Sequence, residues 1–391
     1  MLNHTAELGG GELALVRLCR ALDPTRTRVR AILFADGPMR ARLEACGVPV
    51  DVIEMDSAAA TVDRYAASAL SLANARRATR LAPFLLRLAY RLWQLRPDVV
   101  YTNSLKAHLV GIPVALLTRA PLVWHIRDRI ADDYLPPRFV QLIRWCARMF
   151  PRRVVVNSHA TGQTLMPCPT TVAYSGFEAD QPIGDPGRHV PPRPPVVGIV
   201  GRISPTKGQL DFVRAAALVL RSHPTARFRV IGSPMFGARD YADRVHTEVA
   251  MLGIADAVEF SGFAEDPLAA LDGLSAFVHA SPVPEPFGQV IVEAMIRGVP
   301  VIAARGGGAT EVVAPREAGM SDDGPFGLLI DPGDPAILAG AICEILDHPD
   351  AARARAAIAY RSALARFPIE RTVRQVTGAW FAAAGRKDRV E

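Results

Sequence analysis

Two basic side chains, Arg202 and Lys207, stand in the segment VGIVGRISPTKG (197–208). The pattern predicts a strand that ends at Gly201, a turn, and a helix over about 207–221. Free amides and the helix dipole at a helix N-terminus add to the charge of nearby cations, so this arrangement could bind a diphosphate. An Arg and a Lys in such a loop are also commonly just solvated, and these residues alone leave both interpretations open.

A second group lies in SPVPEPFGQVIVEAMIRGV (281–299), where three prolines exclude helix until Gly288. Glu285 is therefore expected in the loop at the mouth of a helix. Glu293 lies more than two helical turns behind it, where it could accept hydrogen bonds from a diol. The amides of Phe287 and Gly288 would point outward at the mouth. A structural hydrogen bond inside the core is the alternative role for Glu293.

Glycines recur where predicted strands end, at Gly201, Gly232 and Gly262, the last directly before Phe263, and again at 306–308. Glycine lets a ligand approach the backbone closely, and ligands of doubly wound sheets bind at the carboxyl edge of the strands. Any one of these glycines could simply form a turn. Their common location is what indicates a binding edge.

Two common nucleotide-binding classes are excluded by the same glycines. A dinucleotide fingerprint requires G-x-G-x-x-G followed by an acidic residue, but Gly198 and Gly201 offer only G-x-x-G, and Gly9-Gly10-Gly11 lacks a third spaced glycine. The sequence also contains no G-x-x-x-x-G-K-[ST], so a P-loop nucleotidase is not expected.

Short β-branched runs alternate with helical patterns through both halves of the chain, which predicts two doubly wound parallel sheets. A stretch rich in Pro and Gly, 178–195, separates them and is typical of a linker. The predicted strands cover 29–34, 48–53, 98–102, 122–126, 153–157, 171–175, 196–201, 227–232, 258–262, 276–280, 299–303 and 327–330.

The length agrees with two domains, because 391 residues are more than a single hydrophobic core usually contains. Half of the residues are hydrophobic and 21% are charged, as in ordinary globular proteins. The net charge of +6 is compatible with binding to polyanionic partners. Arginines distributed over the surface for solubility would give the same net charge. Five cysteines without metal or disulfide spacing indicate a reducing cytoplasm.

Neither a signal peptide nor a bilayer-spanning run is recognisable. The segment 81–93 (LAPFLLRLAYRLW) could lie on an anionic membrane, with Phe84, Leu85, Leu88 and Trp93 entering the interface, or could pack on its own domain, which we favour. The first glycine run arrives after only eight residues, so we expect the first strand to be truncated and the natural chain to begin upstream.

Together, the motifs GRISPTKG, EPFGQVIVEAMIRGVPVIA, GGGATEVV and GLLIDPGDP resemble the C-terminal domain of glycosyltransferase family 4, over roughly 196–347. GGGE near the start and WHIRD in the middle resemble the family's N-terminal domain. The resemblance implies a GT-B fold, two Rossmann-like α/β domains that face a cleft. The expected limits are 1–177 for the acceptor-side domain, 178–195 for the linker, 196–366 for the nucleotide-sugar domain and 367–391 for a helix that crosses back.

The resemblance also implies roles for residues at matching positions. Arg202 and Lys207 would hold the donor diphosphate, Glu293 the ribose, and Glu285 would sit against the transferred sugar. His125 would approach the sugar from the other domain, with a core or surface histidine as the alternative. Backbone amides near Phe287, Gly288 and Gly10 would complete the diphosphate cradle, and the base would stack near Gly262 and Phe263. Gly11, Gly201 and Gly232 are also expected among the residues that bind the nucleotide sugar.

The expected reaction is transfer of a sugar, typically a hexosyl group, from a nucleotide-diphosphate sugar to a glycan, lipid-linked or small-molecule acceptor, with retention at the anomeric carbon. No metal, cofactor or nucleic-acid partner is expected. A longer loop at 314–326 departs from the family pattern, so acceptor and sugar specificity do not follow from the resemblance. A GT-B phosphorylase, an epimerase and a catalytically dead nucleotide-sugar-binding subunit stay open as alternatives.

Overall fold

The chain forms two compact units, which are Met1–Glu178 with Ile369–Glu391, and Ala179–Pro368. The computed structural model describes residues 1–55, 72–178, 181, 191–235, 237–264, 266–319 and 325–386, and only the backbone within 72–80. The expected domain limits at 177 and 367 lie within two residues of the unit boundaries. Most of the expected linker, 178–195, and part of the loop 314–326 lie outside the described residues.

Unit 1 is built on a seven-stranded sheet in which every described pairing is parallel. The segment 1–5, expected to hold a strand fragment, contributes a central strand of two residues. In sheet order the strands are β3 (Val50–Val52), β2 (Ala31–Leu33), β1 (Leu2–Asn3), β4 (Val100–Thr102), β5 (Leu122–Ile126), β6 (Arg153–Val156) and β7 (Thr171–Val172).

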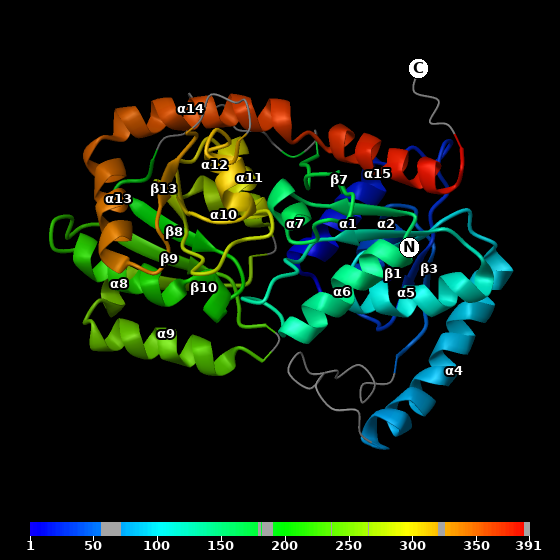
Figure 1. Ribbon diagram of the computed structural model, residues 1–391. Coiled ribbons are helices and arrows are strands. Elements are labelled where there is room, and N and C mark those ends of the chain that lie inside the picture. Colours follow the sequence, from blue (N-terminus) through cyan, green and yellow to red (C-terminus); the bar gives the residue numbers. More distant parts are fainter. Residues whose placement is uncertain are drawn as a thin grey trace. The chain divides into compact units, whose positions relative to one another are not determined.

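Two helix layers cover the unit 1 sheet and bury separate apolar cores (Figure 1). One layer consists of α1 (Gly10–Ala21), α2 (Pro38–Ala45) and α15 (Ile369–Ala383), so the C-terminal segment belongs to this unit. The other consists of α4 (Leu72–Leu95), α5 (Leu105–Thr118) and α6 (Pro137–Met149). A short helix, α7 (His159–Gln163), follows β6.

The arginine-rich segment 81–93 forms part of α4 and packs on its own domain. Phe84 and Leu88 are 2% and 0% exposed within the core of this layer, and Leu85 is partly buried against it. The interpretation that Phe84 and Leu88 enter a membrane is therefore wrong, because the sheet face already covers them. Trp93, by contrast, is 60% exposed.

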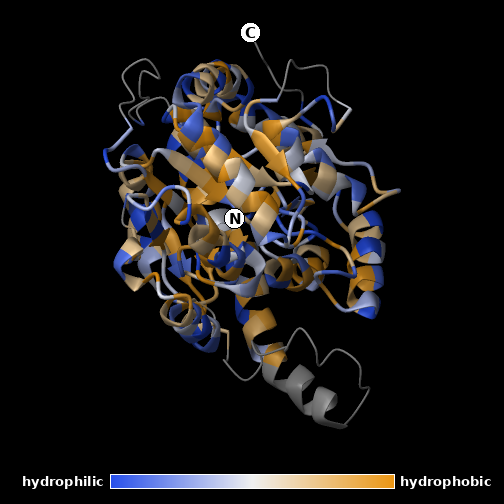
Figure 2. Ribbon diagram, turned by 90° about the vertical axis from the view of Figure 1, so that its left-hand side faces the viewer, coloured by the Kyte–Doolittle hydropathy of each residue, from blue (hydrophilic) through white to orange (hydrophobic). Residues whose placement is uncertain are grey.

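Unit 2 has a six-stranded parallel sheet. In sheet order the strands are β10 (Val258–Gly262), β9 (Arg227–Ile231), β8 (Val196–Val200), β11 (Ala276–His279), β12 (Val301–Ala304) and β13 (Leu328–Ile330). The twelve strands predicted from sequence are all present across the two sheets. Figure 2 shows the strands as mostly hydrophobic, as expected when helices cover both faces of a parallel sheet.

The helices of unit 2 also form two groups. On one face α8 (Gln209–Val219), α9 (Arg239–Met251) and α13 (Pro335–Asp347) share a core with the strands. Elsewhere α11 (Gln289–Ile296) contacts α10 (Pro267–Asp272), α12 (Gly308–Val313) and α14 (Pro349–Arg366). The short 3-10 helices are η1 (Pro205–Lys207) and η2 (Ala255–Ala257).

Local sequence explains several of these helix starts. Asp266 and Asp334 cap α10 and α13, each accepting hydrogen bonds from two backbone amides, and each is followed by a proline at the first helical position. An aspartate at the N-cap satisfies amides that have no partner within the helix, and proline there loses no hydrogen bond. These caps define where α10 and α13 begin.

Candidate functional site

The turn after β8 holds both basic residues predicted to bind an anion. Lys207 closes the 3-10 helix η1, and α8 begins only at Gln209, two residues later than expected from sequence. The reason is Gly208, whose φ of +77° lies in the left-handed region. A β-carbon there would lie 1.9 Å from the carbonyl oxygen of Ala280, so only glycine lets this turn pack against the end of β11.

Gln209 fixes the shape of that turn. Its side chain is 1% exposed, and Nε2 donates to the carbonyl oxygen of Arg202 over 2.8 Å while Oε1 accepts from the amide of Ser204 over 3.4 Å. One buried side-chain amide thus ties Arg202 and Ser204, in the first part of the turn, to the first residue of α8. Arg202 and Lys207 are both partly exposed.

Three side chains meet beside this turn. Lys207 Nζ lies 2.7 Å from Glu285 Oε2, and His279 Nε2 lies 3.3 Å from the same oxygen. The side chains are 22%, 15% and 4% exposed for Lys207, Glu285 and His279. The predicted anion-binding lysine and the predicted sugar-side glutamate therefore belong to one cluster, which also includes His279, the last residue of β11.

Electrostatics keep Glu285 ionised. Burial alone would raise the pKa of this carboxyl group, but the positive charge of Lys207 and the hydrogen bond from His279 outweigh it and hold the pKa well below its ordinary value. A carboxylate at this position can accept hydrogen bonds from hydroxyl groups but has no proton to donate. Lys207 retains donor capacity beyond Glu285, because an ammonium group carries three protons.

The backbone of Glu285 is held by the glycine run that follows β12. Glu285 and Gly307 form an isolated parallel bridge, and the amide of Gly308 donates to the Glu285 carbonyl oxygen over 2.8 Å. Gly307 has a φ of +62°, and a β-carbon on it would lie 2.1 Å from that oxygen. The glycines at 306–308, expected to permit close approach of a ligand, thus permit close approach of the Glu285 loop.

Helix α11 begins where the sequence predicts it. Gly288, with a φ of +90°, is its N-cap, and Phe287 before it is buried against Phe367 with ring centroids 5.7 Å apart. Glu293 lies in the second turn, 5% exposed, and accepts a hydrogen bond from Gln289 Nε2 over 3.1 Å. This bond is the structural role weighed as the alternative from sequence.

Three glycines are linked along the carboxyl edge of the sheet. The amide of Gly201 donates to the carbonyl oxygen of Ile231, and the amide of Gly232 donates to that of Gly262, over 2.9 and 2.7 Å. Gly262 has open space where a β-carbon would lie, and Phe263 beside it is 55% exposed. The arrangement offers bare backbone next to an exposed aromatic ring, which suits stacking of a planar base.

Unit 1 gathers polar side chains at the carboxyl edge of its own sheet. Arg127 Nε donates to Asn103 Oδ1 over 2.7 Å, and Nη1 donates to Ser175 Oγ over 3.1 Å. Asn103 in turn donates to the carbonyl oxygen of Gly11 over 3.3 Å. A β-carbon on Gly11 would lie 3.3 Å from Arg127 Cδ, whereas one on Gly10 would meet nothing within 4 Å. The predicted Gly10–Gly11 start of α1 is therefore tied to an arginine that sequence reasoning did not single out.

His125 lies in β5 with no exposed surface. Its Nδ1 is 2.5 Å from Tyr101 Oη and 3.4 Å from Arg127 Nη2, and Nε2 has no hydrogen-bond partner among the described residues. Burial, followed by the nearby charge of Arg127, lowers the pKa of His125 well below its ordinary value, so the ring is neutral. The core location weighed from sequence is the one observed.

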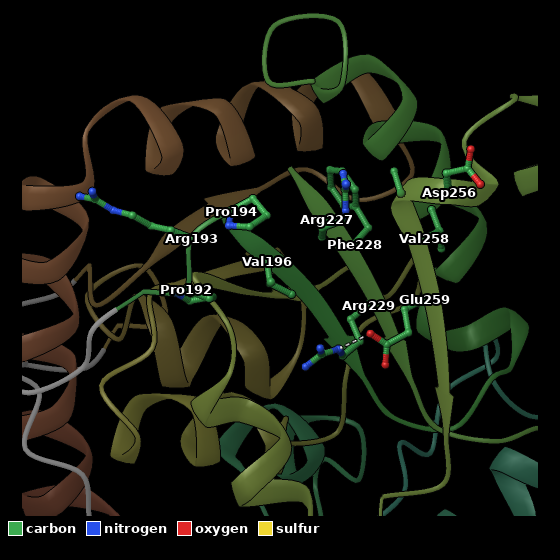
Figure 3. A pocket seen from close by; sticks show the side chains of 11 residues that line it. Pro192, Arg193, Pro194, Val196, Arg227, Phe228, Arg229, Asp256, Val258 and Glu259 are labelled. Atoms are coloured by element: carbon green, nitrogen blue, oxygen red, sulfur yellow. Dashed lines mark hydrogen bonds and ion pairs between the residues drawn. The ribbon is translucent and has the colours of Figure 1, made fainter. Parts of the chain in front are cut away.

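A hollow of about 430 Å³ occurs at the opposite edge of the unit 2 sheet, where β8, β9 and β10 begin (Figure 3). Arg193, Arg227 and Arg229 lie around it, and Arg229 pairs with Glu259 over 3.1 Å. Ligands of doubly wound sheets bind at the carboxyl edge. This hollow is therefore separate from the Lys207–Glu285 cluster.

The residues that sequence reasoning missed are Gln209, His279, Arg127 and Asn103. His279 could have been found, because a histidine that ends a predicted strand directly before the SPVPEPFG loop lies at the expected binding edge. Within the described part of the chain, no group of three or more His, Cys, Asp and Glu could hold a metal ion.

Two family models match the chain. "Glycosyl transferases group 1" matches residues 185–362, and "Glycosyl transferase 4-like domain" matches residues 9–166. A curated relative, the D-inositol 3-phosphate glycosyltransferase of Acidothermus cellulolyticus, is 38% identical over 196 residues, which cover 47% of this chain. The match spans only 40% of that relative's length.

Solved structures resemble the chain over nearly its whole length. Anabaena Alr3699/HepE in complex with UDP and glucose is 28% identical with a TM-score of 0.81, and the match covers 97% of this chain and 98% of that one. Sucrose-phosphate synthase from Thermosynechococcus elongatus, 19% identical with a TM-score of 0.76 and 98% of both chains covered, shares the fold.

Both models describe glycosyl transferases, and each match lies within one of the two units, 9–166 in unit 1 and 185–362 in unit 2. The twelve predicted strands, the two parallel sheets and the glycines at their carboxyl edges agree with that assignment. The chain belongs to glycosyltransferase family 4, with a GT-B fold.

Proposed function

We propose that the protein transfers a sugar, typically a hexosyl group, from a nucleotide-diphosphate sugar to an acceptor hydroxyl, with retention at the anomeric carbon. The observation that carries this proposal is the Lys207–Glu285–His279 cluster at the carboxyl edge of the unit 2 sheet. It places a cation suited to a diphosphate beside a carboxylate suited to sugar hydroxyls.

In this proposal Lys207 and Arg202 hold the diphosphate and stabilise the charge that develops on it as the bond to the sugar breaks. Fixed donors of this kind act most strongly where charge appears in the transition state. The acceptor oxygen attacks the face that the diphosphate leaves, and the departing phosphate oxygen takes the acceptor's proton. Glu285 stays ionised throughout and orients the sugar. Because the acceptor oxygen itself attacks the anomeric carbon, no covalent glycosyl-enzyme intermediate forms.

The nucleoside binds farther along the same edge, with its ribose at Glu293 and its base near Gly262 and Phe263. The exposed Phe263 ring and the open space at Gly262 support this placement. The solved complex of HepE contains UDP and glucose, which makes UDP-glucose the first donor to test.

The acceptor side belongs to unit 1, where Arg127, Asn103 and Ser175 form a hydrogen-bonded group at the sheet edge. The neutral, buried His125 positions Arg127 through its Nδ1 contact. We propose a glycan, lipid-linked or small-molecule acceptor, a cytoplasmic location, and a role in polysaccharide or cell-envelope synthesis.

Thermal unfolding against UDP-, GDP- and ADP-sugars tests the donor. A ligand at a hundred times its dissociation constant stabilises a protein by about 2.7 kcal/mol, so the correct donor raises the unfolding temperature measurably. A Lys207→Ala variant that remains folded should lose that shift. The absence of a shift with every donor would contradict the proposal.

Product analysis separates the alternatives. Anomeric NMR signals of the product report retention directly. A requirement for free phosphate instead of an acceptor would indicate a phosphorylase, isomerisation of the donor alone would indicate an epimerase, and donor binding without turnover or hydrolysis would indicate a binding subunit.

A further inference from the structure

The large apolar side chains that unit 1 exposes are concentrated on one helix layer. Eight such residues lie on α4, α5 and α6, whereas the described residues of α1, α2 and α15 contribute none. Their exposures range from 44% to 65%. The eight residues, which we call the apolar face, are Leu86, Tyr90, Trp93, Leu116, Leu117, Leu142, Trp145 and Met149.

On two of the helices these residues recur at helical spacing. Leu86, Tyr90 and Trp93 fall at intervals of four and three on α4, and the Tyr90 and Trp93 rings stack with centroids 6.2 Å apart. Leu142, Trp145 and Met149 fall at intervals of three and four on α6. Residues three and four apart share one side of a helix, so each helix has a second apolar stripe besides the one that packs on the sheet.

The same layer carries charge of a single sign. The segments Leu72–Leu95, Leu105–Thr118 and Pro137–Met149 contain nine Lys and Arg and no Asp or Glu. The net charge of the whole chain is only +6. The positive excess of the protein is therefore concentrated in these three helices.

Some of these arginines have internal roles. Arg91 pairs with Asp51, and Arg144 donates to the carbonyl oxygens of Thr164 and Ile130. Arg138 and Arg148 are both exposed on α6; Arg138 lies one helical turn before Leu142 in line with the apolar stripe, and Arg148 lies beside it. No acidic residue occurs between 134 and 177, so α6 and the segments that follow it as far as β7 contribute cations and no carboxylates. The exposed Asp132 and Asp133 precede the helix.

We propose that the apolar face docks on an anionic lipid bilayer, with its aromatic and aliphatic side chains in the interface and the arginines on lipid phosphates. Trp and Tyr favour the membrane–water interface, and long basic side chains reach headgroups from apolar surroundings. No helix among the described residues is long and apolar enough to cross a membrane, so the contact is with one surface. This inference is independent of the proposed catalytic activity.

The main alternative is that a second copy of the chain binds the apolar face, and the charge of these helices disfavours this. A twofold dimer through this face would bring two layers together that carry only positive charge, and like charges across an interface oppose association. An anionic bilayer supplies the complementary sign over an extended area.

Flotation with vesicles tests the proposal without any activity measurement. The protein should float with vesicles of phosphatidylcholine and phosphatidylglycerol, much less with phosphatidylcholine alone, and less as salt is added. Neutralising either Arg138 or Arg148 should weaken vesicle binding about fivefold, and the double variant Arg138→Glu/Arg148→Glu should weaken it further. Arg353→Glu with Arg361→Glu, on exposed positions of α14, makes the same charge change elsewhere and should leave binding close to that of the parent.

Tryptophan fluorescence identifies the face that docks. The chain has four tryptophans, of which Trp93 and Trp145 belong to the apolar face while Trp124 and Trp380 are at most 8% exposed. Brominated phosphatidylglycerol should quench the parent protein, and the Trp93→Phe/Trp145→Phe variant should show little quenching although it still binds.

Three results would overturn the proposal. The first is failure to float with phosphatidylglycerol vesicles at low salt. The second is equal loss of binding in the α6 and α14 variants, and the third is binding without quenching of the parent. A dimer in light scattering that dissociates in a Trp93→Ala/Trp145→Ala variant would instead assign this face to a second copy of the chain.

Discussion

Lys207 and Glu285 are 78 residues apart in the chain, yet Lys207 Nζ donates to Glu285 Oε2 over 2.7 Å. The contact joins the turn after β8 to the loop that precedes α11, two segments that emerge from the carboxyl edge of one sheet. Both side chains are less than a quarter exposed. Such a pair gives each loop a fixed position relative to the other, and loss of one partner leaves an uncompensated charge with little solvent.

Lys207→Ala should reduce turnover by about a hundredfold to a thousandfold, the usual cost of removing one fixed donor from a developing negative charge. Steady-state rates at saturating donor measure the effect. The matched control is Arg214→Ala on α8, which removes an ion pair of the same 2.7 Å length to Glu248 away from the glycine edge. Turnover close to that of the parent in a folded Lys207→Ala variant would contradict the assigned role.

Glu285→Gln should separate binding from turnover. Glutamine has nearly the same shape as glutamate but does not neutralise Lys207, so the affinity for a nucleoside diphosphate should stay the same or rise. Turnover should fall about a hundredfold, because the group that orients the sugar loses its charge-assisted hydrogen bonds. Calorimetry with the nucleoside diphosphate, together with steady-state rates, measures both. Weaker nucleotide binding with unchanged turnover would be the opposite pattern and would place Glu285 at the diphosphate.

Most of the fold could be predicted from sequence, because buried parallel strands appear in a sequence as short apolar runs between helical patterns. The start of α8 was predicted two residues early, since the left-handed turn at Gly208 is set by the Ala280 carbonyl group, far along the chain. Arg127 was missed for a related reason. Its partners Asn103 and Ser175 are 24 and 48 residues away in the chain, and the three become neighbours only because separate strands of unit 1 end at the same edge of their sheet.

Gly307→Ala should destabilise the protein far more than Gly333→Ala. Both glycines have positive φ, +62° and +81°, but a β-carbon at 333 meets nothing within 4 Å whereas one at 307 lies 2.1 Å from the Glu285 carbonyl oxygen. Gly333→Ala should therefore cost about 1 kcal/mol from backbone conformation alone. Gly307→Ala should cost at least about twice that, and should also lower activity by displacing Glu285. Urea unfolding measures the free energy of unfolding of both variants. Equal losses of stability would show that the Glu285 loop moves away from the added methyl group at no cost in free energy.

The stability of unit 1 should fall on acidification because its buried histidines are neutral. His108 Nδ1 forms a hydrogen bond of 2.6 Å with Thr102 Oγ1, and the ring stacks on Trp124. Burial lowers the pKa of His108 from 6.5 to about 3. The unfolded chain then binds more protons than the folded one at any pH between these values, so the free energy of unfolding should decrease as pH falls below about 6.5, by up to about 1.4 kcal/mol per pH unit for each such group. His108→Asn should lower stability at pH 7 yet flatten this slope by one proton, in urea unfolding measured at a series of pH values. A parallel pH dependence in the variant and the parent would show that His108 binds protons equally in the folded and the unfolded chain.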